Sequence, residues 1–246
     1  MIIGSKLSFY KELTSTNETA RLQLRKSDLP EGYTIHTDFQ IAGKGQSGNR
    51  WESQDGKNLL FSIILYPKSV DPQDQFYISM MISLGIHDFI SSHLEGCKIK
   101  WPNDIYINDD KIAGILVENT LLGDLIESTI AGIGLNVNQQ EFPGYISNPV
   151  SMRLAAGKEF DRQLCLIKLL SDLDSRYRQL IYGDRESLKG EYVSHLYRLK
   201  EWNRYRCAEK DFEGRLTGIS DSGMLRIEDR NGSLMEYRFK EIDYVP

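Results

Sequence analysis

Two segments in the first quarter of the chain have the hydrophobic patterns of β-strands. Residues 33–40 alternate apolar and polar side chains, as a strand with one buried face does. Residues 59–66 form an almost unbroken apolar run, which is typical of a strand buried on both faces. The pattern therefore predicts two strands, which are joined by a glycine-rich stretch over residues 43–51.

The middle of the chain mixes helical and strand patterns. Apolar side chains recur three and four positions apart over residues 73–94, which predicts a long core helix. A shorter helix is expected from Ser15 to Arg25, because Ser15 and Glu18 have the spacing of a capping box. The same reasoning predicts further strands at 98–100, 105–107, 112–118 and 128–137, and helices at 161–182 and 184–198.

After about residue 200 the pattern changes to short alternating runs separated by turns. Asn231-Gly232 between two such runs is a strong hairpin signal. Four short strands in so few residues predict a small β-barrel, so we expect two domains, residues 1–190 and residues 191–246. The four predicted strands cover 204–208, 213–218, 224–227 and 234–239.

Composition narrows the class of protein. The chain has 246 residues, 40% of them hydrophobic, and a formal net charge of −5. An acidic balance argues against general nucleic-acid binding, which needs surplus Lys and Arg to neutralise phosphates. No apolar run is long enough to span a bilayer, and the first residues do not resemble a secretory signal. Three scattered cysteines form neither a disulfide framework nor a CxxC pair, so we expect a cytoplasmic protein without a structural metal.

Residues 43–48 match G-x-G-x-x-G literally, but their context does not fit a dinucleotide fingerprint. That fingerprint requires the loop to open a helix, whereas the residues after Gly48 carry no apolar helical stripe. Asn49 and Arg50 stand where a P-loop has Lys and Ser or Thr. Two interpretations stay open: a mobile hairpin loop with no task, or a loop that closes over an anionic ligand and excludes water.

Two later clusters also allow a structural and a functional interpretation. Asp104, after a Pro-Asn turn, either only turns the chain or holds Mg²⁺ near a triphosphate. Lys111, which opens an apolar run, is either an edge residue or an anion ligand. Gly132 and Gly134 interrupt another apolar strand, which often marks close approach of a ligand or backbone. Asn136 on that strand either forms hydrogen bonds with the edge of a nucleobase or satisfies buried polar groups of the backbone.

Together these clusters, in this order and spacing, resemble the biotin protein ligases. The matching stretches lie between about residues 10 and 140, and the pair Lys-Trp-Pro-Asn-Asp and Lys-Ile-Ala-Gly-Ile-Leu-Val-Glu is the most specific. The resemblance implies an α+β fold, in which a mixed β-sheet of the class II synthetase-like type is flanked by helices and followed by an SH3-like barrel. It also implies ATP-dependent transfer of biotin to a lysine through biotinyl-5′-AMP, with Mg²⁺ as cofactor. Because about 14 residues precede the Ser-Thr-Asn motif, we expect a ligase-only member without a DNA-binding domain.

The resemblance also implies roles for individual residues. Lys111 and Lys44 are the expected catalytic cations, and Asp104 is the expected metal-side carboxylate. The expected ATP contacts are Arg50, Trp51, Asn103 and Asn136. The expected biotin contacts are Ser15, Thr16, Asn17, Gln40, Gly43, Lys44, Gly45, Gln46, Lys111 and Gly114. The expected acceptor is a biotin carboxyl carrier domain of a carboxylase, with no DNA or membrane partner, and a homodimer is compatible with the sequence.

One departure from the family pattern concerns the glycine-rich loop. The family loop often carries repeated arginines, whereas this chain has Gln46, Ser47 and Asn49. A neutral donor in place of a charged one predicts faster leakage of the adenylate. Two rival functions stay open: a lipoate or octanoate ligase on the same scaffold, and a non-catalytic RNA-binding module that uses the aromatic and basic residues 197–206.

Overall fold

The computed structural model describes residues 1–245, with Ser47 described for its backbone only. A seven-stranded sheet forms its centre, and only the β1–β2 pair is parallel. The mixed sheet that the family resemblance implies is therefore confirmed. From one edge to the other, its strands are β1 (Leu7–Leu13), β2 (Thr34–Gln40), β3 (Leu59–Leu65), β7 (Leu125–Leu135), β6 (Asp110–Leu122), β5 (Asp104–Ile107) and β4 (Cys97–Lys100).

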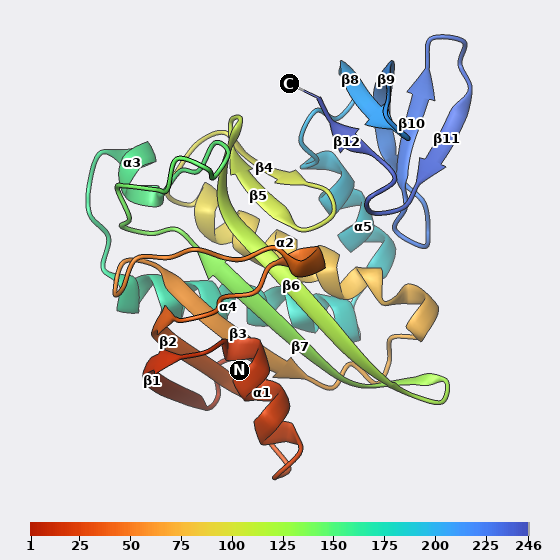
Figure 1. The fold of residues 1–246 in the computed structure, drawn as a ribbon. Helices are drawn as coiled ribbons and strands as arrows, with labels where there is room; N and C mark the ends of the chain where they lie inside the picture. The colour runs from red at the N-terminus through yellow and green to blue at the C-terminus, as the bar shows by residue number, and fades with distance from the viewer. Residues whose placement is uncertain (246) are drawn as a thin grey trace.

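Helices cover both faces of this sheet (Figure 1). Strand β3 shows why: alternate residues Phe61, Ile63 and Leu65 join the large core cluster, whereas Ile64 joins a smaller cluster with Ala20 of the opposite helix. The unbroken apolar run therefore reflects burial on both faces. The larger cluster is covered by α2 (Phe76–Ser91), α4 (Arg162–Tyr182) and α5 (Arg185–Ser194), and the smaller one by α1 (Thr16–Leu24).

The C-terminal residues form a second, antiparallel sheet beside the first, as expected for a small SH3-like barrel (Figure 1). The apolar core is continuous between the two sheets, since Tyr205 and Leu216 belong to the same cluster as Phe89. Trp101 also donates a hydrogen bond from Nε1 to the Gly223 carbonyl at 2.9 Å. The strands of this sheet are β11 (Leu234–Tyr237), β10 (Leu225–Asp229), β9 (Lys210–Ile219), β8 (Trp202–Cys207) and β12 (Asp243–Tyr244).

The structure corrects several details of the sequence prediction. Ser15 is the N-cap of α1, but its hydroxyl makes no capping hydrogen bond, and Glu18 pairs instead with Lys44. The capping box was therefore a wrong prediction, although the helix start was right. The helix expected at 184–198 ends at Ser194. Strand β1, strand β12 and helix α3 (Met152–Ala156) were not predicted.

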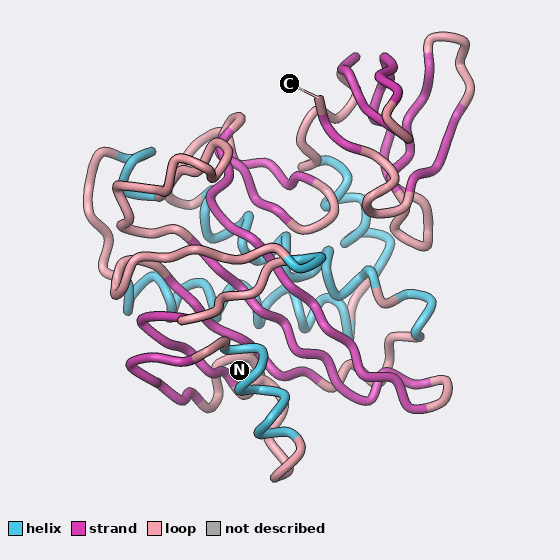
Figure 2. Tube along the Cα trace, in the orientation of Figure 1, coloured by secondary structure: helices cyan, strands magenta, loops and turns pink. Residues whose placement is uncertain are grey.

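The glycine-rich loop crosses in front of β6 and β7, as the tube view shows (Figure 2). It contains one 3-10 turn, η1 (Gln46–Gly48), after which Asn49 returns to extended backbone. The prediction that this loop does not open a helix is confirmed. No helix among residues 1–245 combines the length and the apolar character that a membrane span needs.

Candidate active site

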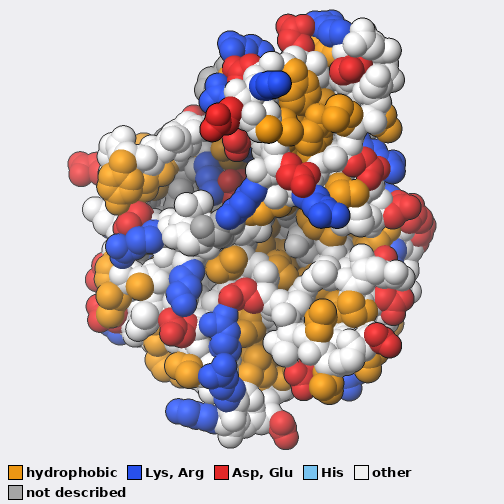
Figure 3. All heavy atoms as spheres, turned by 45° about the vertical axis from the view of Figure 1, so that its right-hand side comes forward, with side chains coloured by type: hydrophobic (Ala, Val, Ile, Leu, Met, Phe, Trp, Pro, Cys, Tyr) orange, Lys and Arg blue, Asp and Glu red, His pale blue; other side chains and the backbone are white. Residues whose placement is uncertain are grey.

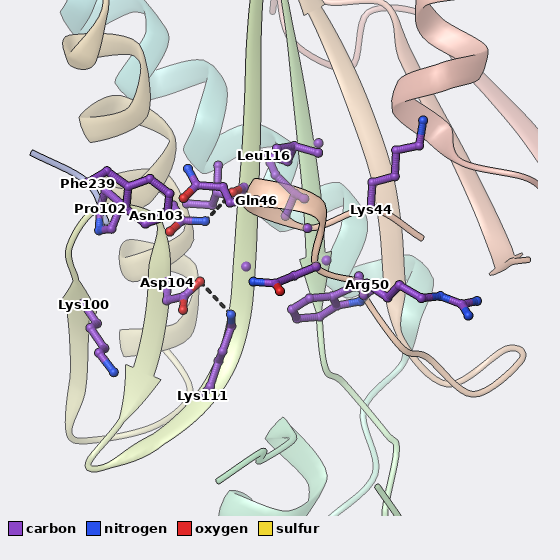
Figure 4. A pocket seen from close by; sticks show the side chains of 18 of the residues that line it. Lys44, Gln46, Arg50, Lys100, Pro102, Asn103, Asp104, Lys111, Leu116 and Phe239 are labelled. Atoms are coloured by element: carbon purple, nitrogen blue, oxygen red, sulfur yellow. Dashed lines mark hydrogen bonds and ion pairs between the residues drawn. The ribbon is translucent and has the colours of Figure 1, made fainter. Parts of the chain in front are cut away.

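A cavity of about 330 Å³ lies between the glycine-rich loop and the central sheet (Figure 4). Its walls come from segments far apart in the chain: the start of α1, residues 44–51, strands β6 and β7, and residues 239–244 of the C-terminal domain. The space-filling view shows a hollow beside the C-terminal domain with Lys and Arg side chains around it (Figure 3). The cavity unites most of the site residues that the sequence predicts.

The α1 end of the cavity is a fixed polar network. Thr16 donates hydrogen bonds to Gln40 Oε1 from its backbone N–H at 2.7 Å and from its hydroxyl at 3.1 Å. Asn17 donates from Nδ2 to Glu118 Oε2 at 2.8 Å, and its Oδ1 lies 2.6 Å from the Ser62 hydroxyl. Ser15, Thr16 and Asn17 are all buried. Polar groups so constrained are suited to matching a small polar ring by hydrogen bonds.

Trp51 forms the floor of the cavity because three backbone positions leave room for it. A Cβ atom on Gly114 would lie 2.8 Å from Trp51 Cζ3, and one on Gly134 would lie 2.6 Å from Trp51 Nε1. On Gly43, a Cβ would lie 2.5 Å from the Trp51 carbonyl oxygen. These positions therefore require glycine. A close approach at Gly134 was expected from a ligand or another backbone, whereas the group that approaches is the Trp51 side chain.

Lys111 lies opposite the loop and points into the cavity, where its Nζ is 2.8 Å from Asp104 Oδ1 (Figure 4). The same ammonium lies 5.7 Å from the centre of the Trp51 ring. Both side chains of the ion pair are partly buried, with 31% and 22% of Lys111 and Asp104 exposed. An ammonium in such a position can approach two anionic ligands at once.

A second cavity of about 1220 Å³ adjoins the first. It contains Asn136, whose Nδ2 donates to the Val150 carbonyl at 3.0 Å while its Oδ1 has no partner among the described residues. Residues shared by the two cavities mark the place where they meet. These are Asn49, Arg50, Trp51, Lys100, Asp104, Lys111 and Tyr244.

Two predicted cations lie differently from Lys111. Lys44 lines the first cavity but pairs with Glu18 at 3.3 Å, and Arg50 donates to the Ile41 carbonyl at 3.1 Å. Figure 4 shows both side chains directed away from Lys111. As described, the loop therefore presents its backbone, Gln46 and Trp51 to the cavity rather than its charges.

Several cavity side chains keep a buried polar atom without a hydrogen-bond partner among residues 1–245: Gln46 Oε1, Trp51 Nε1, Asn136 Oδ1 and Tyr244 Oη. Unpaired buried polar atoms are costly, so their gathering here indicates a place for a polar ligand. Tyr244 was missed by sequence reasoning because its strand has only two residues.

No three His, Cys, Asp or Glu side chains of residues 1–245 are grouped as a closed metal site requires. Mg²⁺ that binds together with a nucleotide needs only one or two carboxylates, since phosphate and water oxygens complete its coordination. Asp104 fits that need because it lines both cavities.

Residues 202–206 of the basic and aromatic segment at 197–206 belong to β8 of the C-terminal sheet. Tyr205 is buried, and Arg204 and Arg206 both pair with Asp211, at 2.9 and 2.6 Å. A single-strand platform needs free aromatic faces and free cations together, so this arrangement does not favour the RNA-binding interpretation.

The fold and the site are those of a small-molecule ligase domain, and comparison with known proteins gives the family. The model of the biotin/lipoate A/B protein ligase family matches residues 9–136. The bifunctional ligase/repressor BirA of Bacillus subtilis is 33% identical over 237 residues, which cover 94% of this chain and 72% of that protein. This chain belongs to the biotin/lipoate A/B protein ligase family.

Two further relatives extend the comparison. The biotin–[acetyl-CoA-carboxylase] ligase of Paracoccus denitrificans is 28% identical over 201 residues, which cover 78% of this chain and 82% of that one. The structure of the biotin protein ligase of Aquifex aeolicus in complex with biotin and ATP has a TM-score of 0.82 at 28% identity and covers 98% of this chain and 100% of that one. The likeness therefore includes the C-terminal domain.

Proposed function

We propose that this chain is an ATP-dependent biotin–protein ligase that attaches biotin to a lysine of a biotin carboxyl carrier domain through biotinyl-5′-AMP. One observation carries the proposal: Lys111 stands at the junction of a small polar cavity and a larger one, facing the glycine-rich loop. Two anionic substrates can therefore meet at one ammonium. We also propose that the enzyme acts in the cytoplasm and that residues 1–190 and 191–246 are its two domains.

The small cavity is the proposed biotin site. The ureido ring of biotin has one carbonyl acceptor and two N–H donors, and Ser15, Thr16, Asn17 and Gln40 offer both kinds of partner. A lipoyl or octanoyl chain carries no ureido group that could match this polar wall, so binding it would remove water from polar atoms without replacing those hydrogen bonds. The polar network supports biotin over the lipoate alternative. Gly43, Gly45, Gln46 and Gly114 complete the proposed contacts.

The larger cavity is the proposed ATP site, with Asn136 beside the adenine and Trp51 toward the phosphates. Asn103, which lines the smaller cavity, and Arg50, which would have to turn from the Ile41 carbonyl, complete the proposed phosphate contacts. A carboxylate oxygen of biotin attacks the α-phosphorus, and the electron pair of the broken bond leaves with pyrophosphate. Lys111 offsets the repulsion between the two anions and holds charge at the reacting oxygens. Mg²⁺, when bound with ATP, neutralises phosphate charge, and Asp104 is the side chain that would hold it.

Lys44 requires a rearrangement to act as the second catalytic cation. Its ion pair with Glu18 is half-exposed, with 47% and 40% of the two side chains exposed, so breaking it costs little, about 0 to 1 kcal/mol. Movement of the loop over the adenylate would bring Lys44 toward the phosphate and exclude water. The carrier lysine amine then attacks the acyl carbon and AMP leaves.

Pyrophosphate exchange tests the assignment of substrate. We expect biotin to drive exchange of labelled pyrophosphate into ATP, and lipoate and octanoate to leave it at background. Thr16→Val should raise the KM for biotin more than that for ATP, whereas the matched control Thr14→Val changes an exposed residue outside the cavity. Exchange driven by lipoate or octanoate, but not by biotin, would refute the proposal. A homodimer is compatible with it, and light scattering measures the oligomeric state.

A further inference from the structure

Most cations that line the cavities already have a carboxylate partner. The pairs are Lys44 with Glu18 at 3.3 Å, Arg50 with Glu52 at 3.8 Å, and Lys111 with Asp104 at 2.8 Å. Lys100 also lines both cavities, yet no carboxylate oxygen of residues 1–245 lies within 4.0 Å of its ammonium. Lys100 is therefore a cation of the site whose charge is not neutralised by a direct ion pair.

Two tyrosines hold this ammonium in place. Lys100 Nζ donates a hydrogen bond to the Tyr106 hydroxyl at 3.0 Å and lies 4.7 Å from the centre of the Tyr106 ring and 5.0 Å from that of Tyr244. Burial lowers the pKa of Lys100, and Arg198 acts in the same direction, while Asp104 and Asp243 oppose them. Aromatic faces orient a cation without taking all of its donors. Two of the three N–H groups are thus left for a ligand.

The position of Lys100 indicates what that ligand is. Figure 4 shows Lys100 and Lys111 on either side of Asp104, at the junction of the two cavities. The Tyr244 hydroxyl at the same junction is buried and has no hydrogen-bond partner among the described residues. An unneutralised ammonium beside an unused hydroxyl donor is suited to a multiply charged anion.

We propose that Lys100 binds the β- and γ-phosphates of ATP and neutralises the pyrophosphate as it leaves. The proposal rests on the proposed function. In the first half-reaction, the bond from the biotin carboxylate oxygen to the α-phosphorus forms while the bond to the bridging oxygen breaks, and pyrophosphate takes the electron pair. In the second, an amine displaces AMP and no pyrophosphate takes part. Lys100 therefore acts in the first half-reaction only.

The test separates the two half-reactions. Lys100→Met keeps the length and apolar stem of the side chain but removes the charge. We expect it to slow pyrophosphate release from ATP and biotin about 100-fold, the effect of losing one preorganised charged donor. It should also weaken product inhibition by added pyrophosphate. Transfer from supplied biotinyl-AMP to a carrier domain should stay within about twofold of the wild-type rate, which also shows that the variant is folded.

Two further variants are matched controls. Lys98→Met removes an exposed lysine of the same strand that lines neither cavity, and both half-reactions should be unchanged. Lys100→Arg keeps a cation, and we expect it to recover most of the first half-reaction.

Three results have distinct meanings. Wild-type rates of pyrophosphate release from Lys100→Met would overturn the role of Lys100 and leave the proposed function intact. Equal losses in both half-reactions would also overturn it, because a packing role predicts that pattern. A wild-type chain that neither releases pyrophosphate with biotin nor accepts biotinyl-AMP would refute the proposed function itself, and the role of Lys100 with it.

Discussion

Gly132→Ala tests whether the polar end of the cavity is as tightly packed as the structure shows. Gly132 on β7 faces Asn17, and a Cβ atom at this position would lie 2.9 Å from Asn17 Cγ and closer still to Oδ1. The Asn17 side chain cannot move away freely, because it is buried and bonded to Glu118 at 2.8 Å and lies 2.6 Å from the Ser62 hydroxyl. The substitution must therefore break these contacts or displace the strand.

The magnitude follows from the contacts at risk. Overpacking costs about 1 to 3 kcal/mol, and loss of one neutral hydrogen bond adds about 1 kcal/mol. We expect the free energy of unfolding of Gly132→Ala to fall by about 2 to 4 kcal/mol. Since Asn17 belongs to the proposed biotin site, the KM for biotin should rise by more than the KM for ATP.

Urea unfolding and pyrophosphate exchange measure the two effects. Gly190→Ala is the matched control, because Gly190 lies inside α5 and a Cβ atom there meets nothing within 4 Å. Helix propensity predicts that this control stabilises the protein by up to about 1 kcal/mol. An unfolding free energy and a biotin KM for Gly132→Ala equal to those of the wild type would refute the packing argument.

Three other predictions concern the charge of Lys111, the ion pair of Asp88 with Arg176, and retention of the adenylate by the glycine-rich loop. Lys111→Ala should raise the barrier to adenylate formation by about 3 kcal/mol, the scale of one lost charged donor; a near-normal rate of pyrophosphate release would remove Lys111 from the mechanism. Burial alone would raise the pKa of Asp88, but contacts from His87 and Arg176 outweigh it and lower that pKa to about 2. The ionised Asp88 should therefore contribute fully to the free energy of unfolding above about pH 4, and this contribution should be lost as the pH falls toward 2. Thermal unfolding across this range should show a smaller pH dependence for Arg176→Gln, and an unchanged slope would contradict the assignment. Gln46→Arg should release less free biotinyl-adenylate during turnover than the wild type, and equal release, measured by trapping, would refute the leakage argument.

Much of the fold follows from hydrophobic periodicity. The long helix expected at 73–94 is α2, and the run at 59–66 is β3. Strand β1 escaped prediction because it is an edge strand with mostly exposed or half-buried residues, so its pattern carries little contrast. Helix α3 has only five residues, too few to show a period. Periodicity reports burial, and elements with little burial are therefore the ones it misses.

Some features of the candidate site could also be predicted from the sequence, whereas others depend on tertiary structure. The close packing at Gly134 could be predicted from its place in an apolar strand, although not the Trp51 side chain that causes it. The position of Lys111 in the cavity was implied by the family resemblance, because its local pattern also allows an edge residue. The ion pair of Lys44 with Glu18 could not, since it depends on how the loop lies across α1. Lys100 begins the Lys-Trp-Pro-Asn-Asp motif, but the sequence pattern predicts no role for it. Its significance depends on the partners of neighbouring cations, and tertiary structure alone determines those partners.

The central claim is that one cavity, walled by distant segments, forms biotinyl-AMP and shields it from water. The most direct test is native mass spectrometry of the full chain mixed with ATP, Mg²⁺ and biotin. The account predicts a bound species with the mass of biotinyl-AMP, which disappears when a biotin carrier domain is added. A spectrum that shows ATP and biotin unchanged, with no adenylate free or bound, would contradict it.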